Sequence, residues 1–481
     1  MTIDAMMVIG GKVVGSATWT DVRNPANLSQ IVGRYPNGTV ANASDAVAAA
    51  ESAFHAWQAL TPEARAALLN QAAGVVAQNH ENWARTLTAE NGKTLAESTV
   101  DFQIAMLGLT CFNAHVSWLH EDVRDNERRR LRIQKRPYGV CVAIIPWNFP
   151  PTLAATKIGP ALLAGNTMVV KVPEFAPLAT MQFLAAIAEV LPPGVLNVVS
   201  GFGAEVGSAL VRDPRVRKIA FTGSTAVGKL VMADAAAHLA RVTLELGGND
   251  AAIVLDDANI DEQLIQRMVT GAYSAAGQVC FAIKRVYVHA SRYDELVAGL
   301  RAALDRFVVG DGLRAEVTMG PLNNERQFSR VRQLLAETQA GGHEVVQLGS
   351  FAAGTDVDNA YFMLPHLVLN PSDSAAIVCC EQMGPILPVM KFDTADEAVA
   401  RANASPYGLA SSVWSRDMDR AMAIGARLEA GITFVNAHSL FALDPDAPFG
   451  GFKESGMGYE LGGTVGLGQY VQYKSITDNH M

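Results

Sequence analysis

Val140-Cys141-Val142-Ala143-Ile144-Ile145 is the stretch that decides the fold, because every one of its side chains is apolar or a thiol. A strand without polar alternation is buried on both faces, which is typical of a parallel sheet covered by helices. Helical spacing follows at 153–164, and then a second strand of the same kind at Thr167–Lys171. The stretch therefore predicts a βαβ unit.

The same alternation continues along the chain. Helices are expected at 179–190, 204–211 and 228–238, and strands between and after them at 195–200, 218–221 and 241–246. A second series follows Gly248, with elements expected at 251–255, 261–276, 285–289, 293–307, 323–340 and 431–436. Ahead of the first strand, 44–76 and 81–119 have helical spacing. There Thr61-Pro62 marks a helix start and Gly92 a break.

This pattern predicts an α/β fold with two parallel-sheet domains and no internal repeat. The first, a Rossmann-like domain, is expected to combine residues 1–119 and 138–247, and the second to take 248–447. Two remaining segments, 120–137 and 465–481, contain stretches that alternate polar and apolar residues. Alternation is typical of strands with one exposed face, so we expect these segments to form a small β element at an oligomer interface.

Composition narrows the function classes. The chain has 481 residues, of which 49% are hydrophobic and 18% charged, as in compact globular proteins. Its net charge of −9 argues against binding to nucleic acid or to an anionic membrane. The basic run at 128–136 alternates with apolar residues, so a solvated strand face explains it better than a polyanion site.

The cysteines and the N-terminus indicate the compartment. Five cysteines are present, and none has the Cys-x-x-Cys spacing of a metal or redox site: Cys111, Cys141, Cys280, Cys379 and Cys380. A sparse, odd set of thiols fits a reducing compartment. No signal peptide and no apolar run of about 18 residues is visible. We therefore expect a cytoplasmic protein with no metal site.

Three short segments carry reactive groups. Pro146–Pro150 contains Asn148, Leu244–Gly248 contains Glu245, and Gly277–Cys280 ends on a thiol. A nucleophile, a general base and an oxyanion donor need these three side-chain types. Each residue alone also has an ordinary structural explanation: a buried cysteine, a carboxylate at a strand end and an asparagine in a turn.

Two further segments are candidates for nucleotide binding. The Gly-x-Gly-x-x-Gly fingerprint is absent. Gly201-Phe202-Gly203 begins such a pattern, but Val206 stands at the position of its third glycine. Phe221–Gly228 is the better candidate, because small residues between a strand and a helix let N–H groups approach a pyrophosphate. Lys171-Val172-Pro173-Glu174 adds a carboxylate that can accept both ribose hydroxyls and would repel a 2′-phosphate. This favours NAD over NADP, although either segment alone could be a helix cap or a surface pair.

Taken together, the segments resemble the aldehyde dehydrogenase superfamily over nearly the whole chain, from Asn24 to Lys474. The matching residues, in the family's order, are Pro146–Pro150, Lys171–Glu174, Phe221–Gly228, Glu245–Gly248, Gly277–Cys280, Glu381 with Gly384-Pro385, Asn436, Pro448–Lys453 and Ser455-Gly456. The resemblance implies the aldehyde dehydrogenase fold, with an NAD-binding domain, a catalytic domain and oligomerisation strands. It also implies a homodimer or homotetramer.

The resemblance implies that the protein is an NAD-dependent aldehyde dehydrogenase. Cys280 would add as thiolate to the aldehyde, while the Asn148 amide stabilises the oxyanion. Hydride transfer to NAD would leave a thioester, which water activated by Glu245 would hydrolyse. Lys157 and Glu460 match positions that form a proton path in relatives.

The resemblance also implies cofactor and substrate residues. The cofactor contacts would be Trp147, Lys171, Glu174, Gly223, Ser224, Glu381 and Met383. The aldehyde channel would be lined by Phe149, Leu153, Val279, Phe281, His438 and Phe441. This channel is mostly apolar, which favours an uncharged aldehyde. Met383 stands where the family commonly has phenylalanine, which puts its stacking on the nicotinamide ribose in doubt.

Other substrates and other reactions are also compatible with parts of this sequence. A dicarboxylic semialdehyde substrate would want a cation in the channel, and the sequence does not show whether Lys284 or Arg285 reaches it. A CoA-acylating relative typically lacks the carboxylate that Glu245 supplies. A Cys-His hydrolase would depend on His438 and would leave the nucleotide segments unexplained. A catalytically silent relative would not need Cys280, Asn148 and Glu245 together.

Overall fold

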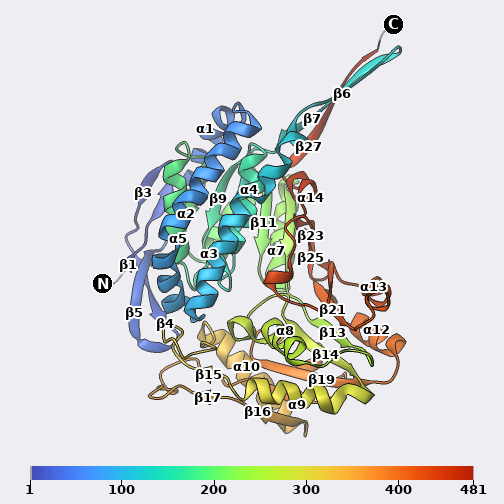
Figure 1. The fold of residues 1–481 in the computed structure, drawn as a ribbon. Helices are drawn as coiled ribbons and strands as arrows, with labels where there is room; N and C mark the ends of the chain where they lie inside the picture. Colours follow the sequence, from blue (N-terminus) through green and yellow to red (C-terminus); the bar gives the residue numbers. More distant parts are fainter. Residues whose placement is uncertain (1–2, 480–481) are drawn as a thin grey trace.

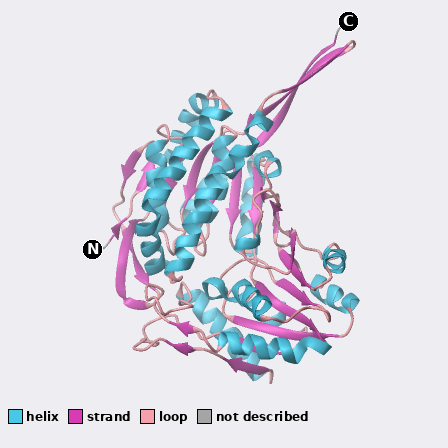
Figure 2. Cartoon of the chain, in the orientation of Figure 1, coloured by secondary structure: helices cyan, strands magenta, loops and turns pink. Residues whose placement is uncertain are grey.

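Two large sheets organise the molecule (Figure 1, Figure 2). The computed structural model describes residues 3–479. The first sheet has eight strands, five of which are parallel and lie in the order β12-β11-β8-β9-β10. Their bounds are Arg241–Glu245 (β12), Val216–Thr222 (β11), Val140–Ile144 (β8), Thr167–Lys171 (β9) and Leu196–Val199 (β10). The antiparallel strands β25 (Gly456–Met457), β2 (Met7–Ile9) and β3 (Lys12–Val14) complete its edges. The parallel strands confirm the predicted α/β class.

The strand order reverses beside β8. The chain runs from β8 outward to β9 and β10, and then returns to place β11 on the other side of β8. In open α/β sheets, ligands bind beyond the carboxyl ends of the strands at such a reversal. The segments that follow β8, β9, β11 and β12 therefore meet at one edge, and all of the predicted catalytic and nucleotide segments of the first half belong to them.

Helices cover the first sheet, and their ends follow the capping signals of the sequence. They are α1 (Val40–Gln58), α2 (Pro62–Asn91), α3 (Leu95–Thr110), α4 (Pro150–Leu163), α5 (Leu178–Val190), α6 (Ser208–Arg212) and α7 (Thr225–Ala235). Thr61 caps α2 through its side chain, with Pro62 at the first helical position. Gly92 ends α2 with φ 96°, a left-handed conformation that suits glycine. The predicted helix start and the predicted break are both confirmed.

The second sheet has seven strands in the order β16-β18-β19-β14-β13-β21-β22. Their bounds are Glu344–Gln347, His366–Leu369, Ile386–Phe392, Ile283–His289, Asp250–Val254, Ala410–Trp414 and Ile432–Val435. All are parallel to their neighbours except β16. The accompanying helices are α8 (Glu262–Tyr273), α9 (Tyr293–Leu304), α10 (Glu325–Ala340), α12 (Ala395–Asn403) and α13 (Met418–Gly425). Each large sheet has a separate apolar core.

A three-stranded arm extends away from the body of the molecule toward the C-terminus (Figure 1). It consists of β6 (Asp122–Asn126), β7 (Arg129–Pro137) and β27 (Val471–Asn479), all antiparallel. Apolar side chains are exposed on it, including Val123 and Tyr473. The ends of the predicted segments 1–119 and 465–481, residues 1–2 and 480–481, lie outside the described residues. Within residues 3–479 no helix is both long and apolar enough to cross a membrane.

A third, smaller apolar cluster lies where the two sheets meet. Its members come from both halves of the chain: Phe149, Ala275, Val279, Phe281, Ala282, Leu409, Ala410, Phe434 and Phe449. The rings of Phe281 and Phe449 pack edge to face with centroids 5.6 Å apart. This junction therefore brings the segment after β8 against the segment before β14, which carries the predicted nucleophile.

Candidate active site

The loop that carries Cys280 has an unusual backbone. After α8 it passes through Ala275 (φ 49°), Ala276 (φ 55°) and Gly277 (φ 75°), three consecutive left-handed residues. Left-handed alanines are rare because their Cβ atoms crowd the following carbonyl. A Cβ at Gly277 would lie 2.4 Å from the carbonyl oxygen of Gly384, so only glycine fits there. This constrained path delivers the half-buried Cys280 to the junction between the sheets.

Cys280 is a protonated thiol at neutral pH in this environment. Burial raises the pKa of the thiol to about 12, and the carboxylates of Asp250, Glu245 and Glu381 add to the rise. The Lys284 ammonium opposes them. Because the thiolate is the nucleophilic form, the thiol has to lose its proton as it adds to a substrate.

Glu245 ends β12 with its side chain buried, 3% of the residue being exposed. Neither carboxylate oxygen has a hydrogen-bond partner among residues 3–479. Burial and the nearby Glu460 raise the pKa of Glu245 well above its usual value, and Lys157 acts in the opposite direction. A carboxyl with a raised pKa and no fixed partner is suited to accept and release a proton.

A buried ion pair lies close to Glu245. Lys157 on α4 and Glu460 on β26 (Glu460–Leu461) approach within 2.6 Å between Nζ and Oε1. The Thr156 hydroxyl also donates to Glu460, at 3.5 Å. Lys157 and Glu460, predicted as a proton path, thus lie together within the electrostatic reach of Glu245.

Asn148 lies in the turn between β8 and α4, and 6% of it is exposed. Its Nδ2 donates to the carbonyl oxygen of Gln278, at 3.0 Å. This bond joins the amide to the loop that carries Cys280, two residues before the cysteine. An amide nitrogen carries two hydrogens, so the second remains available to a substrate oxygen.

The predicted ribose pair also forms. Lys171 Nζ lies 3.2 Å from Glu174 Oε1, and the same oxygen accepts the N–H of Gly203 at 2.5 Å. Burial lowers the pKa of Lys171, while the Glu174 carboxylate opposes this shift. Ser224 caps α7 by accepting the Val227 N–H, at 3.4 Å, and leaves the other N–H groups of the first turn without intrahelical partners.

Glu381 contacts the segment that follows β12. Glu381 accepts the N–H of Gly248 at 3.0 Å and lies 3.7 Å from Lys284 Nζ. A Cβ at Gly247 would lie 2.6 Å from a Glu381 oxygen, so that glycine leaves room for the carboxylate. Met383 is left-handed, with φ 49°. The structure therefore brings Glu381 against Gly247 and Gly248, which follow Glu245 closely along the chain.

A pocket of about 260 Å³ opens beside the loop that carries Cys280. It is lined by Ala96, Glu97, Val100, Phe149, Thr270, Gly271, Ser274, Val279, Phe281, Ser439, Leu440 and Phe441. Four of the predicted substrate residues belong to this lining, namely Phe149, Val279, Phe281 and Phe441. Leu153 packs against the junction cluster instead.

His438, the remaining residue of that prediction, does not line the pocket and lies behind Phe281. It is buried, and its ring nitrogens lie 2.9 Å from Ser412 Oγ and 2.8 Å from the carbonyl oxygen of Phe281. Both nitrogens thus face partners within the protein, and the ring supports Phe281 from behind.

Neither cation that the sequence left open lines the pocket. Lys284 donates to the carbonyls of Val279, at 3.0 Å, and Cys280. Arg285 is buried and donates to the carbonyl of Asn249 at 2.8 Å. Lys284 therefore stabilises the backbone of the loop that carries Cys280, and Arg285 stabilises the backbone just before β13.

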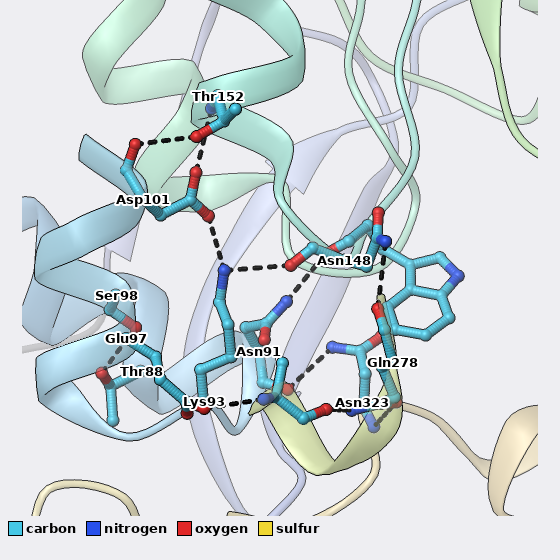
Figure 3. Close-up of polar contacts among 12 residues, drawn as sticks. Thr88, Asn91, Lys93, Glu97, Ser98, Asp101, Asn148, Thr152, Gln278 and Asn323 are labelled. Atoms are coloured by element: carbon cyan, nitrogen blue, oxygen red, sulfur yellow. Dashed lines mark hydrogen bonds and ion pairs between the residues drawn. The ribbon is translucent and has the colours of Figure 1, made fainter. Parts of the chain in front are cut away.

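Sequence reasoning missed a group of polar residues around Asn148 (Figure 3). Lys93 donates to the Asn148 carbonyl at 2.9 Å, and Asn91 donates to the Trp147 carbonyl at 2.7 Å. Asp101 pairs with Lys93 and accepts the Thr152 N–H at 2.9 Å. Their partners lie some 50 positions away along the chain, so no local pattern could have identified them.

Comparison with known proteins shows the family of the chain. The family model described as the aldehyde dehydrogenase family matches residues 13–476. A putative aldehyde dehydrogenase, FUS7, of Gibberella fujikuroi is 36% identical, with 97% of each chain covered. The glutarate-semialdehyde dehydrogenase of Pseudomonas aeruginosa is 36% identical over 95% of this chain and 93% of its own.

A solved structure, that of a putative aldehyde dehydrogenase from Burkholderia cenocepacia, superposes with a TM-score of 0.94. It is 32% identical and covers 98% of this chain and 97% of its own. The family uses NAD or NADP. The chain thus belongs to the aldehyde dehydrogenase family, and it is an oxidoreductase that converts an aldehyde to a carboxylic acid.

Proposed function

We propose that this protein oxidises an uncharged aldehyde with NAD, through a covalent intermediate on Cys280 that water releases. The observation that carries the proposal is the bond from Asn148 Nδ2 to the Gln278 carbonyl, at 3.0 Å, because it links the amide to the loop of the only thiol at the junction among the described residues. The Cys280 sulfur adds to the aldehyde carbon, and the thiol proton passes to solvent water. The Asn148 amide then donates to the oxygen that becomes negative.

The residues at the crevice fit a nicotinamide dinucleotide. Glu174 and Lys171 stand at the end of β9, Ser224 at the start of α7, and Glu381 beside Gly248. Helix N-termini with free N–H groups favour phosphate, and carboxylates accept ribose hydroxyls. When bound, the nicotinamide supplies the acceptor for the hydride that the thiohemiacetal carbon loses, which leaves a thioester on Cys280. The Glu174 charge disfavours a 2′-phosphate and supports NAD over NADP.

The environment of Glu245 favours water as the acceptor of the acyl group. Its carboxylate is buried, has no hydrogen-bond partner among the described residues and has a raised pKa. Such a group can take a proton from water as the water attacks the thioester. Lys157 and Glu460, paired at 2.6 Å, would carry that proton away. Water rather than CoA is therefore the proposed acceptor.

The pocket supports an uncharged substrate. Among the described residues, its lining includes no lysine, arginine or histidine. Its one charged side chain, Glu97, has both oxygens engaged, with the N–H of Ala275 at 2.6 Å and of Thr94 at 2.9 Å. A terminal carboxylate on the substrate would meet this negative charge without a partner. An aliphatic or aromatic aldehyde is therefore favoured over a dicarboxylic semialdehyde.

The wider organisation is proposed on the same basis. Residues 1–119 and 138–247 would bind the cofactor, 248–447 would supply the nucleophile, and 120–137 with 465–481 would join subunits in a homodimer or homotetramer. The exposed apolar residues Val123 and Tyr473 on the arm support the last role. All five thiols are free, which supports a cytoplasmic location.

The test is NADH formation, followed by absorbance, with hexanal, benzaldehyde and succinate semialdehyde, each with NAD or NADP and with or without CoA. We expect NADH and free acid from the two uncharged aldehydes without CoA. A faster rate with NAD than with NADP is also expected. Absence of NADH from every aldehyde, or NADH formation that requires CoA and yields an acyl-CoA in place of the free acid, would overturn the proposal.

A further inference from the structure

The face of α3 that points toward the active site carries a repeat of charged residues. Glu97 and Asp101 lie one helical turn apart, and Lys93 stands one turn before them, just ahead of the cap Thr94. Residues four apart lie on one side of a helix. Figure 3 shows all three, with their bonds to segments far away in the sequence. No step proposed above uses any of these three side chains.

Lys93 is tied to the turn that carries Asn148. It is 2% exposed, and its Nζ lies 2.5 Å from Asp101 Oδ2 and 2.9 Å from the Asn148 carbonyl oxygen. The same ammonium lies 4.0 Å from the centre of the Phe149 ring, which lines the pocket. One cation therefore contacts both the oxyanion residue and the substrate wall next to it.

Asp101 also binds the segment that follows Asn148. Its Oδ1 accepts the N–H of Thr152, and its carbonyl accepts the Thr152 hydroxyl, both at 2.9 Å. Thr152 lies in the first turn of α4, where N–H groups have no partner within the helix. The charged pair thus holds the backbone at Asn148 and at Thr152, on either side of Phe149.

Residues around α3 also hold the nucleophile loop. Glu97 Oε1 accepts the N–H of the left-handed Ala275, at 2.6 Å. Asn323 donates from its side chain to the Asn91 carbonyl, at 3.1 Å, and from its backbone to Gln278 Oε1, at 3.0 Å. The turn of Asn148 and the loop of Cys280 are therefore held by one rigid support as well as by their direct bond.

The energetics favour a role in orientation. A buried ion pair pays a desolvation cost that often matches its Coulomb attraction, so apolar residues would stabilise this fold about as well. An oxyanion donor, by contrast, works only when it is preorganised, and a displacement of about 1 Å can lower a rate by about 100-fold. The Lys93–Asp101 pair supplies such preorganisation.

We propose that Lys93 is a positioning residue, which holds the Asn148 backbone so that its amide points at the oxygen of the substrate bound to Cys280. The proposal rests on the role given to Asn148 above. It predicts that Lys93 acts on the rate through Asn148, and that it leaves the reactivity of the Cys280 thiol unchanged.

The test is a double-mutant cycle with Lys93→Met and Asn148→Ala in the full-length enzyme. Lys93→Met alone should lower kcat for hexanal on the order of 10-fold to 100-fold. In the Asn148→Ala background it should lower kcat by less than about threefold, because the group it positions is gone. Alkylation of Cys280 by iodoacetamide forms no oxyanion, so its rate should stay within about twofold of wild type. Lys12→Met, at an exposed lysine of β3, is the matched control and should keep the wild-type kcat.

Each outcome decides the question. If Lys93→Met lowers kcat by the same factor in both backgrounds, or slows alkylation together with turnover, the proposal is overturned. Wild-type kcat in Lys93→Met, with Asn148→Ala impaired, overturns it alone and leaves the proposed function intact. Wild-type kcat in Asn148→Ala overturns the role of Asn148 and this inference with it. If Lys93→Met does not fold, Asn91→Ala, which removes only the bond to the Trp147 carbonyl, should show the same non-additive pattern at about threefold to tenfold.

Discussion

The turn after β8 and the end of β12 lie two strands apart at the same edge of the first sheet, yet their reactive side chains are held in opposite ways. Asn148 is fixed by a bond from its amide to Gln278 and by Lys93 on its carbonyl. Glu245 is equally buried, but neither of its oxygens has a hydrogen-bond partner among residues 3–479.

The difference follows from what each group is proposed to do. An oxyanion donor stabilises charge that develops at one point in space, so its hydrogen must already point there. A general base has to exchange protons with water and with a relay, and strong fixed bonds to its carboxylate would lower its pKa and its basicity. Rigidity at Asn148 and freedom at Glu245 are therefore two requirements of one reaction.

The largest effect that tests this contrast is expected from Glu245→Gln. The amide cannot take a proton from water, so thioester hydrolysis should slow by about 10³-fold. Formation of the thioester does not need that step. A stopped-flow trace should then show a burst of about one NADH per active site, followed by almost no turnover. A trace without a burst would mean that Glu245 acts before acylation.

A smaller loss is expected from Asn148→Ala, by about 10²-fold in kcat. Here the step before the thioester is impaired, so the burst itself should become slow or disappear. Pre-steady-state absorbance at the NADH wavelength distinguishes the two variants. A fast burst retained in Asn148→Ala would contradict the division of roles between the amide and the carboxylate.

The pH profile sharpens the contrast further, because Asn148 does not titrate. Burial raises the pKa of Cys280 to about 12 and that of Glu245 above its usual value. The Cys280 thiol is therefore protonated near neutrality, and Glu245 loses its proton at a higher pH than an exposed glutamate does. kcat/KM should increase with pH, by about tenfold per unit where one proton is lost. Asn148→Ala should lower the curve without changing its shape, and a flat wild-type profile would refute this account.

The smallest effect is expected from Glu460→Gln. The Glu460 charge raises the pKa of Glu245, and Lys157 lowers it. Removing the negative partner leaves the cation, so the pKa of Glu245 should fall. The acidic limb of kcat should then move to lower pH, by about one unit, with a modest loss of maximal rate. A shift to higher pH would show that Glu460 does not act on Glu245 in this way.

Much of the fold could be predicted from the sequence, because strands buried on both faces are continuous apolar runs. Val140–Ile145 predicted β8, and the caps at Thr61 and Gly92 predicted the bounds of α2. The short strand β25 could not be predicted, since its two residues pair with β12 only through tertiary contact. The left-handed Ala275 likewise has no local signal, because alanine ordinarily avoids that conformation.

Some residues of the site could likewise be predicted from the sequence, and others could not. Segments with a chemical signature, such as the one that ends on Cys280, were visible in the sequence together with their carboxylate and amide partners. The positioning residues were not. Lys93 and Asp101 look like ordinary charges on a solvated helix, and only the folded chain buries them against Asn148 and Thr152. Burial of charge against distant backbone is a tertiary property that no spacing rule encodes.

The central claim, that a thioester forms on Cys280 and leaves by way of Glu245, is tested most directly by mass spectrometry. Glu245→Gln enzyme would be mixed with NAD and hexanal, quenched in acid and digested, and the cysteine-containing peptides would be compared with those of wild type. The account predicts a hexanoyl group on Cys280 in the variant, on nearly every chain, and little in wild type. NADH formation without an acyl group on Cys280, or an acyl group on another cysteine, would contradict it.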